Sequence, residues 1–310
     1  MIQPLFEGPV DVVGDVHGDW EGLGRLLQRL GYESDGAHAH GRRLVFVGDL
    51  VDRGPDSVTV CRFVRELMQR GRAQAILGNH ELNLILGKRR PGNEWFYGEA
   101  QLYRDGRPLR QRLAGAAERR ELLAFFRGLP LALEREDARV VHACWHPESV
   151  ESVRAEDDVL AVHERRLREI RRSRPPQEPA GALERELALQ NQNPVQVLTS
   201  GLERAADAAF EADGRSRLAE RVRWWEQYED AAVVVFGHYW RSRDPQRRLS
   251  RRPYLFDGSS PCGALGPRGT AWCIDYSNGH RLAESVERGG AETVAALAAL
   301  RLPERELVLV

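Results

Sequence analysis

The stretch GDLVDRGPDS, residues 48–57, decides how this chain folds. It directly follows an apolar run at residues 44–47, which predicts a buried strand, and it precedes a helical pattern. In an open α/β sheet such a turn lies at the carboxyl edge, where ligands bind. The turn carries Asp49, Asp52 and Arg53, and half-buried charges need a partner or a metal ion. Aspartates that cap the next helix would explain this one motif, so its recurrence along the chain is decisive.

Two further turns in the amino-terminal half repeat this arrangement. An apolar run at residues 9–13 ends in GDVHG, and a run at residues 73–77 ends in GNHE. Apolar residues at helical spacing follow each turn, with Asp19 as the predicted N-cap of the first helix. The repeat length fits βαβ units, in which a helix connects two parallel strands.

Two later apolar runs end in histidine. A predicted hairpin at residues 131–141 leads into His142, and a run at residues 231–236 leads into Gly237 and His238. We expect the carboxyl ends of all five strands to meet at one rim. The six polar side chains expected at this rim are Asp15, His17, Asp49, Asn79, His142 and His238.

These six side chains are more ligands than one tetrahedral ion would need. Carboxylate, imidazole and amide groups together suit divalent ions such as Mn, Fe or Zn. Two ions about 3.5 to 4 Å apart that share one carboxylate would use them all, a geometry suited to displacement at phosphorus. Asp49 on the middle strand is the natural bridging ligand.

The composition excludes several classes of protein. The chain has 310 residues, 42% of them hydrophobic, which is enough for the core of one large domain. A net charge of -1 gives no global field for binding nucleic acid or anionic membranes. No apolar run approaches the roughly 18 residues of a membrane span, and no cleaved leader is expected. The four cysteines lack CxxC spacing and predict buried thiols in a reducing compartment, with the cytoplasm as the default.

Residues 151–230 differ from the rest in being rich in arginine and glutamate, with helical patterns instead of strands. Because strands resume at residue 231, we predict a helical cap inserted in a single domain that spans residues 1–310. Leu218, Val222 and the pair Trp224-Trp225 predict a buried helix face within it.

Three further predictions concern parts of the chain that carry none of these strand-end motifs. His163, in an amphipathic context, is predicted to be solvated. Residues 88–120 are polar and predict a surface excursion with weak helices. Asn278-Gly279 predicts a hairpin turn.

The ordered motifs GDVHG, GDLVDRG, GNHE, VHA at residues 141–143 and GH at residues 237–238 resemble those of the calcineurin-like metallophosphoesterases. Within that superfamily they most resemble the branch that holds phosphoprotein phosphatases and bacterial symmetrical diadenosine tetraphosphatases. Three long blocks in order form a strong signal. The resemblance implies an α/β fold of four layers, with two mixed β-sheets packed face to face and flanked by helices.

The resemblance also implies a role for each ligand. Asp15, His17 and Asp49 would hold a first metal ion. The second would be held by Asp49, Asn79, His142 and His238. Mn is the leading candidate, with Fe, Zn or Ni as alternatives. A hydroxide that bridges the two ions would attack phosphorus.

The remaining implied roles concern catalysis and substrate binding. His80, oriented by Asp52, would protonate the leaving oxygen. Arg53 would bind phosphate oxygens, which its planar guanidinium suits. Tyr239, directly after a ligand, is a candidate for substrate contact. This branch usually has a second phosphate-binding arginine, for which the candidates here are Arg217, Arg221 and Arg223.

We therefore predict a two-metal phosphoesterase that hydrolyses phosphomonoesters, with a phosphorylated protein as the leading substrate. Asp52 favours this side of the family because it can orient the general acid. The alternative is hydrolysis of a dinucleoside polyphosphate such as diadenosine tetraphosphate, so that the partner would be a nucleotide. A noncatalytic scaffold of the same fold should have lost a ligand or the acid, and none is missing here.

Overall fold

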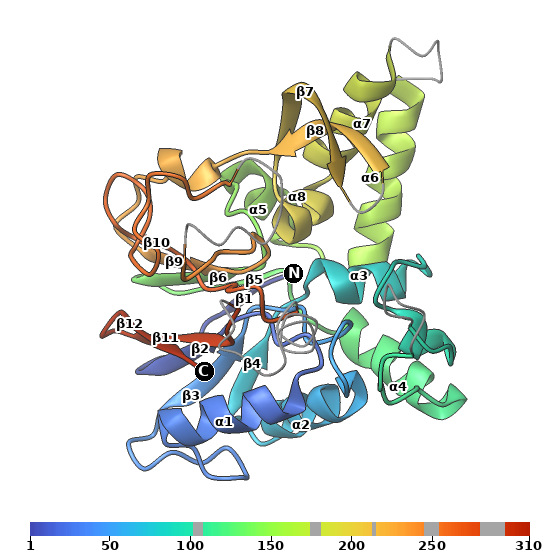
Figure 1. Ribbon diagram of the computed structural model, residues 1–310. Helices are drawn as coiled ribbons and strands as arrows, with labels where there is room; N and C mark the ends of the chain where they lie inside the picture. The colour runs from blue at the N-terminus through green and yellow to red at the C-terminus, as the bar shows by residue number, and fades with distance from the viewer. Residues whose placement is uncertain (102–107, 174–180, 213–214, 245–253, 280–294) are drawn as a thin grey trace.

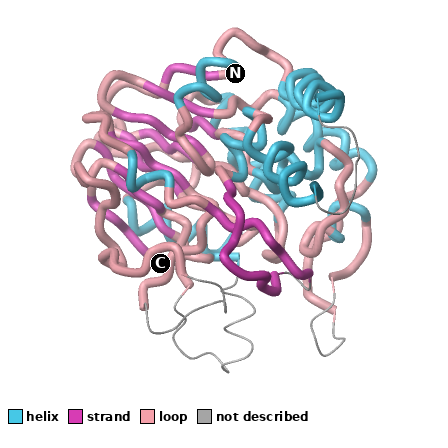
Figure 2. Tube along the Cα trace, turned by 90° about the horizontal axis from the view of Figure 1, so that it is seen from above, coloured by secondary structure: helices cyan, strands magenta, loops and turns pink. Residues whose placement is uncertain are grey.

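The computed structural model describes residues 1–101, 108–173, 181–212, 215–244, 254–279 and 295–310. Two five-stranded sheets lie face to face at the centre, and helices cover the outer face of each (Figure 1). This is the predicted architecture of four layers, in which each apolar surface is buried against the next. Seen from above, the strands gather toward one side of the molecule and most helices toward the other (Figure 2).

Both sheets mix parallel and antiparallel pairs. The first sheet has the order β1 (Ile2–Pro4), β5 (Ala132–Glu134), β6 (Ala138–Val141), β9 (Val233–Phe236) and β10 (Ala271–Cys273). The second has the order β12 (Glu306–Leu309), β11 (Ala298–Leu302), β2 (Val10–Val13), β3 (Arg43–Phe46) and β4 (Ala73–Ala75). Strands β2, β3 and β4 are parallel to one another, and so are β6, β9 and β10. Each parallel set therefore brings its carboxyl ends to one edge.

Alternation along β3 shows why an unbroken apolar run forms this strand. Val45, with Val47 just beyond the strand, packs between the sheets against residues such as Val235. Leu44 and Phe46 lie in the other apolar cluster, on the helix side. Since successive side chains of a strand point to opposite faces, both faces of β3 are buried, each in a different layer.

A helix follows each strand of the β2-β3-β4 set. These helices are α1 (Trp20–Leu30), α2 (Ser57–Gln69) and α3 (Asn79–Ile85), and the chain then forms the short turn η1 (Glu94–Tyr97) and α4 (Ala116–Arg127). Asp19 caps α1 as predicted, because its side chain accepts a hydrogen bond from the N–H of Gly22. Among the described residues, no helix is both long enough and apolar enough to cross a bilayer.

Residues 151–230 contain the predicted helices and also an unpredicted hairpin. The helices are α6 (Val159–Ser173), α7 (Ala182–Asn191) and α8 (Pro194–Ser200), and α5 (Pro147–Val153) leads into this segment. They are followed by β7 (Glu203–Ala212), β8 (Arg215–Arg221) and the short turn η3 (Trp224–Gln227). The predicted helix face is wrong, since Leu218 is 50% exposed on β8 whereas Trp224 and Trp225 are buried. Pairing between β7 and β8 outweighs the weak strand propensity of an alanine-rich and charged sequence.

The structure also corrects three expectations about exposure. His163 is buried, and Cys262 is exposed, whereas Cys61, Cys144 and Cys273 are the buried thiols that were predicted. None of the four cysteines forms a disulfide. Trp95 of the polar excursion is only 1% exposed, so this segment folds back into the core. Burial in these cases comes from packing between distant segments, which a local pattern does not encode.

Candidate metal centre

The six side chains predicted to meet at the strand ends lie close together at the carboxyl edges of the two sheets. Asn79, after β4, places its Oδ1 atom 3.1 Å from Nε2 of His142 and 2.8 Å from Nδ1 of His238, which belong to the opposite sheet. The backbone N–H of His238 donates to Oδ2 of Asp15 at 3.1 Å. The two sheets therefore share this edge, although their strands are far apart in the sequence.

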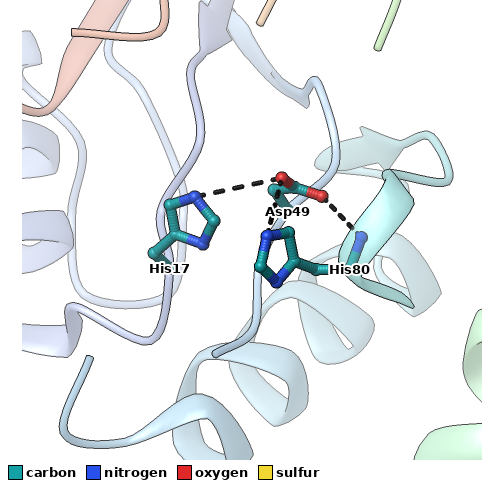
Figure 3. Close-up of side chains that lie close together, drawn as sticks. All are labelled: His17, Asp49 and His80. Atoms are coloured by element: carbon teal, nitrogen blue, oxygen red, sulfur yellow. Dashed lines mark hydrogen bonds and ion pairs between the residues drawn. The ribbon is translucent and has the colours of Figure 1, made fainter. Parts of the chain in front are cut away.

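Asp49 lies at the centre of this cluster. Its Oδ1 atom is 3.4 Å from Nε2 of His142, and its Oδ2 atom is 3.9 Å from Nε2 of His17. Two sets of three residues could each hold a metal ion, because the three ligand atoms within a set lie within 4.8 Å of one another. Asp49 belongs to both sets. One set contains His17, Asp49 and His80 (Figure 3), and the other contains Asp49, His142 and His238.

The donor atoms of this cluster fit divalent metal ions. Oδ1 of Asp15 and Nε2 of His238 are buried and have no hydrogen-bond partner in the part of the chain that the structure describes. Such atoms cost about 1 to 3 kcal/mol each when they stay unsatisfied. A cation would satisfy both, and carboxylate, imidazole and amide donors together suit Mn, Fe or Zn. Metal binding by these residues stays a prediction, but their chemistry is compatible with it.

The acids of the centre differ in their affinity for protons. Burial, with Asp275 nearby, raises the pKa of Asp15 well above its usual range. Burial would also raise the pKa of Asp49, but the imidazoles of His142 and His80 outweigh it and hold that pKa well below the usual range. Asp49 therefore stays ionised, as a ligand shared by two cations must.

The histidines divide in the same way. Burial, together with the guanidinium of Arg53, lowers the pKa of His17 well below its ordinary value, so its imidazole is neutral and able to bind a metal. Burial also lowers the pKa of His142, but the Asp49 carboxylate reverses the effect and raises it to about 10. A cation between Asp49 and His142 would displace that proton, so metal binding there would release a proton.

The turns that carry these residues adopt left-handed backbone conformations. Among the described residues, eight that are not glycine have positive φ, and seven of them lie at this site. The seven are His17 (50°), Asp49 (49°), Asp52 (72°), Arg53 (67°), His238 (71°), Trp240 (54°) and Ser277 (62°). This conformation is unfavourable for residues with a Cβ and persists only where the surroundings impose it. The site is therefore held in place by its neighbours.

Glu81 supplies much of that support, a role the sequence motif GNHE did not reveal. Its carboxylate is fully buried and accepts hydrogen bonds from the backbone N–H groups of Gly78 at 3.0 Å, Asp49 at 2.9 Å and Leu50 at 2.8 Å. Burial and the nearby Asp49 raise its pKa to about 7. Glu81 thus joins the turn after β4 to the left-handed turn after β3.

His80 is held by Asp52 through its imidazole and by Asp49 through its backbone N–H, which donates to Oδ1 of Asp49 at 3.0 Å. Its Nδ1 atom lies 2.6 Å from Oδ2 of Asp52, which leaves Nε2 facing the centre, 3.8 Å from Oδ2 of Asp49. A histidine with this arrangement could bind a metal through Nε2. However, Nη2 of Arg53 lies 3.4 Å from that atom, and a guanidinium would repel a cation bound there. Burial lowers the pKa of His80, but Asp49 and Asp52 outweigh that effect and raise the pKa above its ordinary value. This favours the charged ring, which carries a proton on both nitrogens.

Arg53 points into the same space. Its Nη1 atom is buried and makes no hydrogen bond within the described part of the chain. Gly279 packs directly against it, since a Cβ atom at residue 279 would lie 2.6 Å from Cδ of Arg53 and 2.8 Å from Cδ2 of His17. A partly buried guanidinium with an unused donor beside the ligand cluster is suited to binding an anion.

The segment at residues 275–279 belongs to the site, although the sequence predicts only a hairpin turn there. The carboxylate of Asp275 accepts hydrogen bonds from the N–H groups of Trp240 at 2.9 Å and Ser277 at 2.8 Å. Asn278 is buried and donates from Nδ2 to the backbone oxygen of Val16 at 2.8 Å. The second strand of that predicted hairpin falls outside the described residues. Asp275 follows β10 as Asp15 follows β2, a signal that the sequence does contain.

The three candidate arginines differ in their surroundings. The guanidinium of Arg221 lies over the rings of Tyr239 and Trp240, and its Nη1 atom donates to the backbone oxygen of His238 at 3.0 Å. Arg217 instead pairs with Glu203 and Glu186, and Arg223 pairs with Glu226. Of the three, Arg221 is the one that the structure places beside the candidate ligands.

Tyr239 does not lie where substrate contact would require. Its side chain is 2% exposed and packs in the core, with ring contacts to Phe236 and Trp225. Trp240, the next residue, is only partly buried, and its ring lies 5.0 Å from the guanidinium carbon of Arg53. Tyr239 therefore points into the core and Trp240 toward Arg53. This arrangement follows from the left-handed backbone at His238 and Trp240, which turns the chain away from a regular strand.

The sequence of this chain is similar to those of known proteins. Residues 8–240 match the family described as calcineurin-like phosphoesterase. An asymmetrical bis(5'-nucleosyl)-tetraphosphatase PrpE of Geobacillus sp. (strain WCH70) is 32% identical over 140 residues, which cover 43% of this chain and 56% of that protein. A symmetrical bis(5'-nucleosyl)-tetraphosphatase of Janthinobacterium sp. (strain Marseille) is 37% identical over 134 residues, 42% of each chain.

These alignments cover only part of the relatives, between 29% and 56% of the length of these and similar tetraphosphatases. A crystal structure described as a putative diadenosine tetraphosphatase aligns with a TM-score of 0.47 at 20% identity. That alignment covers 100% of this chain and 96% of the other.

Proposed function

The chain belongs to the calcineurin-like phosphoesterase family, and on that premise we propose that it is a hydrolase that uses two divalent metal ions to cleave phosphomonoesters. The proposal rests above all on one contact, the 2.6 Å hydrogen bond between Nδ1 of His80 and Oδ2 of Asp52. This contact orients a buried imidazole whose other nitrogen faces the candidate ligands. A proton donor in that position is needed most when the leaving group is a poor one, as in an ester of an alcohol.

Two sets of residues would hold the metal ions. Asp15, His17 and Asp49 would hold one ion, and Asn79, His142 and His238 would hold the other together with Asp49. When bound, the ions would neutralise charge on the phosphate and activate water for attack at neutral pH. Mn²⁺ is the first ion to test, because mixed oxygen and nitrogen ligands suit it.

The other residues of the site would bind and protonate the substrate. Arg53 and Arg221 would bind phosphate oxygens, and the unused Nη1 donor of Arg53 supports this assignment. His80 would give its Nε2 proton to the leaving oxygen as the bond to phosphorus breaks, while Asp52 accepts the hydrogen bond from Nδ1 and stabilises the charged ring.

The substrate class divides into two candidates. We propose a phosphorylated protein first, because an oriented general acid assists an alkoxide leaving group most. The relatives named as bis(5'-nucleosyl)-tetraphosphatases support the second candidate, cleavage of a phosphoanhydride in a dinucleoside polyphosphate. A nucleotide leaving group is already a weak base and depends less on a proton donor.

A substrate panel tests the proposal. The chain is stripped of metal, resupplied with Mn²⁺ and assayed on phenyl phosphate, a phosphoserine peptide and diadenosine tetraphosphate. We expect turnover that depends on metal, fastest on the phosphopeptide if the first candidate is right. Diadenosine tetraphosphate as the fastest substrate would establish the second candidate instead. If no substrate turns over, the proposed function fails and the noncatalytic scaffold becomes the favoured alternative.

A further inference from the structure

Trp95 makes a contact with the proposed acid pair that no motif indicates. It lies in η1, within the polar stretch that the sequence predicts to be a surface excursion, but its side chain is 1% exposed. The indole Nε1–H donates to Oδ1 of Asp52 at 2.7 Å. Two distant segments are thereby joined at a fully buried carboxylate.

The two oxygens of Asp52 have different partners. Oδ1 accepts from Trp95, and Oδ2 lies 2.6 Å from Nδ1 of His80. The backbone N–H of Asp52 donates to Oγ of Ser57 at 3.0 Å, and its φ of 72° lies in the left-handed region. A buried carboxylate is stable only when its oxygens are satisfied. An indole N–H can only donate a hydrogen bond. Trp95 therefore satisfies Oδ1 of Asp52 without accepting a proton from His80.

We propose that Trp95 is a positioning residue for the proton donor: it fixes the carboxylate of Asp52 so that Oδ2 holds His80 with Nε2 facing the scissile bond. This role rests on the proposed function, since it presupposes that His80 protonates the leaving group. Without the indole N–H, Oδ1 would be unsatisfied, and the carboxylate would rotate toward other donors. His80 would then lose its fixed orientation.

Packing alone is the competing explanation, because Trp95 also contacts the ring of Phe96. The two explanations predict different kinetics. A packing defect would slow all substrates to a similar degree. A misplaced proton donor would slow esters with poor leaving groups and spare those with good ones, because a good leaving group departs without a proton.

The experiment compares phenyl phosphate, a poor leaving group, with 2,4-dinitrophenyl phosphate, a good one. For Trp95→Phe we expect kcat to fall about tenfold on the first and less than about threefold on the second. His80→Asn should lower kcat on phenyl phosphate by about a hundredfold or more. Trp272→Phe is the matched control, because Trp272 is 9% exposed and its indole N–H has no partner in the described residues. It should leave the ratio of the two rates unchanged.

A double-mutant cycle tests whether Trp95 acts through Asp52. In an Asp52→Asn background, Trp95→Phe should cause no further selective loss, since the two changes break the same chain of contacts. An equally large loss in that background, or an equal loss on both esters, would overturn the proposal. The ¹⁵N-indole resonance of Trp95 gives a readout that does not depend on turnover. It should shift in Asp52→Asn and stay in place in Asp35→Asn, and an unchanged resonance in Asp52→Asn would also overturn the proposal.

Two further results separate this inference from the proposed function. If the wild-type chain with Mn²⁺ hydrolyses neither ester, the proposed function fails and the role of Trp95 fails with it. If His80→Asn shows the selective loss and Trp95→Phe does not, only the role of Trp95 is wrong. Should Trp95→Phe unfold, 3-benzothienylalanine at residue 95 removes the N–H and keeps the ring shape, and the same selective loss is expected.

Discussion

The strand-end rim and the helices of residues 151–230 both bury histidines, but they surround them differently. At the rim His142 lies beside Asp49, whose charge overcomes the effect of burial and raises the pKa to about 10. In α6, His163 is 1% exposed, and burial, with Lys88 and Arg171 nearby, lowers its pKa to about 4. Burial alone therefore does not mark a functional histidine. The pKa of His17 at the rim is lowered as well, so the direction of the shift does not separate the two regions, whereas the position of His17 and His142 beside the Asp49 carboxylate does.

The largest effect is expected from Asp49→Asn, which removes the charge shared by both halves of the candidate metal centre. We expect loss of bound metal and a fall in kcat of at least about a thousandfold, because the rim would then hold histidines without their central carboxylate. Metal content by mass spectrometry and turnover of phenyl phosphate measure the two effects. Asp35→Asn, an exposed acid paired with Arg72, is the control and should change neither. If Asp49→Asn kept two bound ions and the wild-type rate, the Asp49 carboxylate would not be what distinguishes the rim from the helices of residues 151–230.

A smaller effect is expected from Arg221→Ala, at the end of the β7-β8 hairpin. Arg221 contacts the backbone of His238, so this variant tests whether the hairpin supplies part of the rim. We expect kcat/KM to fall about 30- to 100-fold, as a charge-assisted contact to phosphate would predict. Arg217→Ala and Arg223→Ala are matched controls on the same segment and should each cost less than about threefold. A larger loss for Arg217→Ala would show that the substrate approaches from another side.

The rim could be predicted from the sequence because its residues directly follow apolar runs. Asp15, Asp49 and His238 are each fixed by a local pattern, a buried strand and the turn after it, and parallel strands then bring them together. Trp95 could not be predicted, because its partner Asp52 is 43 residues away and no period in the excursion marks it as buried. The sequence does not distinguish Arg221 from Arg217 and Arg223 as a phosphate-binding residue. Pairing of β7 with β8 places Arg221 beside His238. Contacts between segments distant in sequence decide such cases.

The hairpin itself shows the same limit. The sequence of β7 and β8 alternates small and charged residues and has few of the β-branched and aromatic side chains that favour strands. Its two strands are stable because they pair with each other and pack against α7. The helices before it were predicted because α6 has an apolar face that the 3.6-residue period reveals. Elements with their own periodicity are predictable, and elements that depend on a partner are not.

The smallest effect concerns His163 and tests the other side of the comparison. Its pKa is lowered in the folded chain, so the unfolded chain binds more protons below the ordinary histidine pKa, and stability must fall as the pH drops from about 6.5 toward 4. Between pH 8 and pH 5 this histidine alone should cost about 2 kcal/mol of the free energy of unfolding. His163→Gln should remove that part of the pH dependence, measured by urea unfolding of the metal-loaded chain at both pH values. His40→Gln, an exposed histidine, controls for the loss of an imidazole. If both variants lose stability with pH as the wild type does, His163 is charged in the fold. His163 and His142 would then differ in their place in the fold and not in their charge.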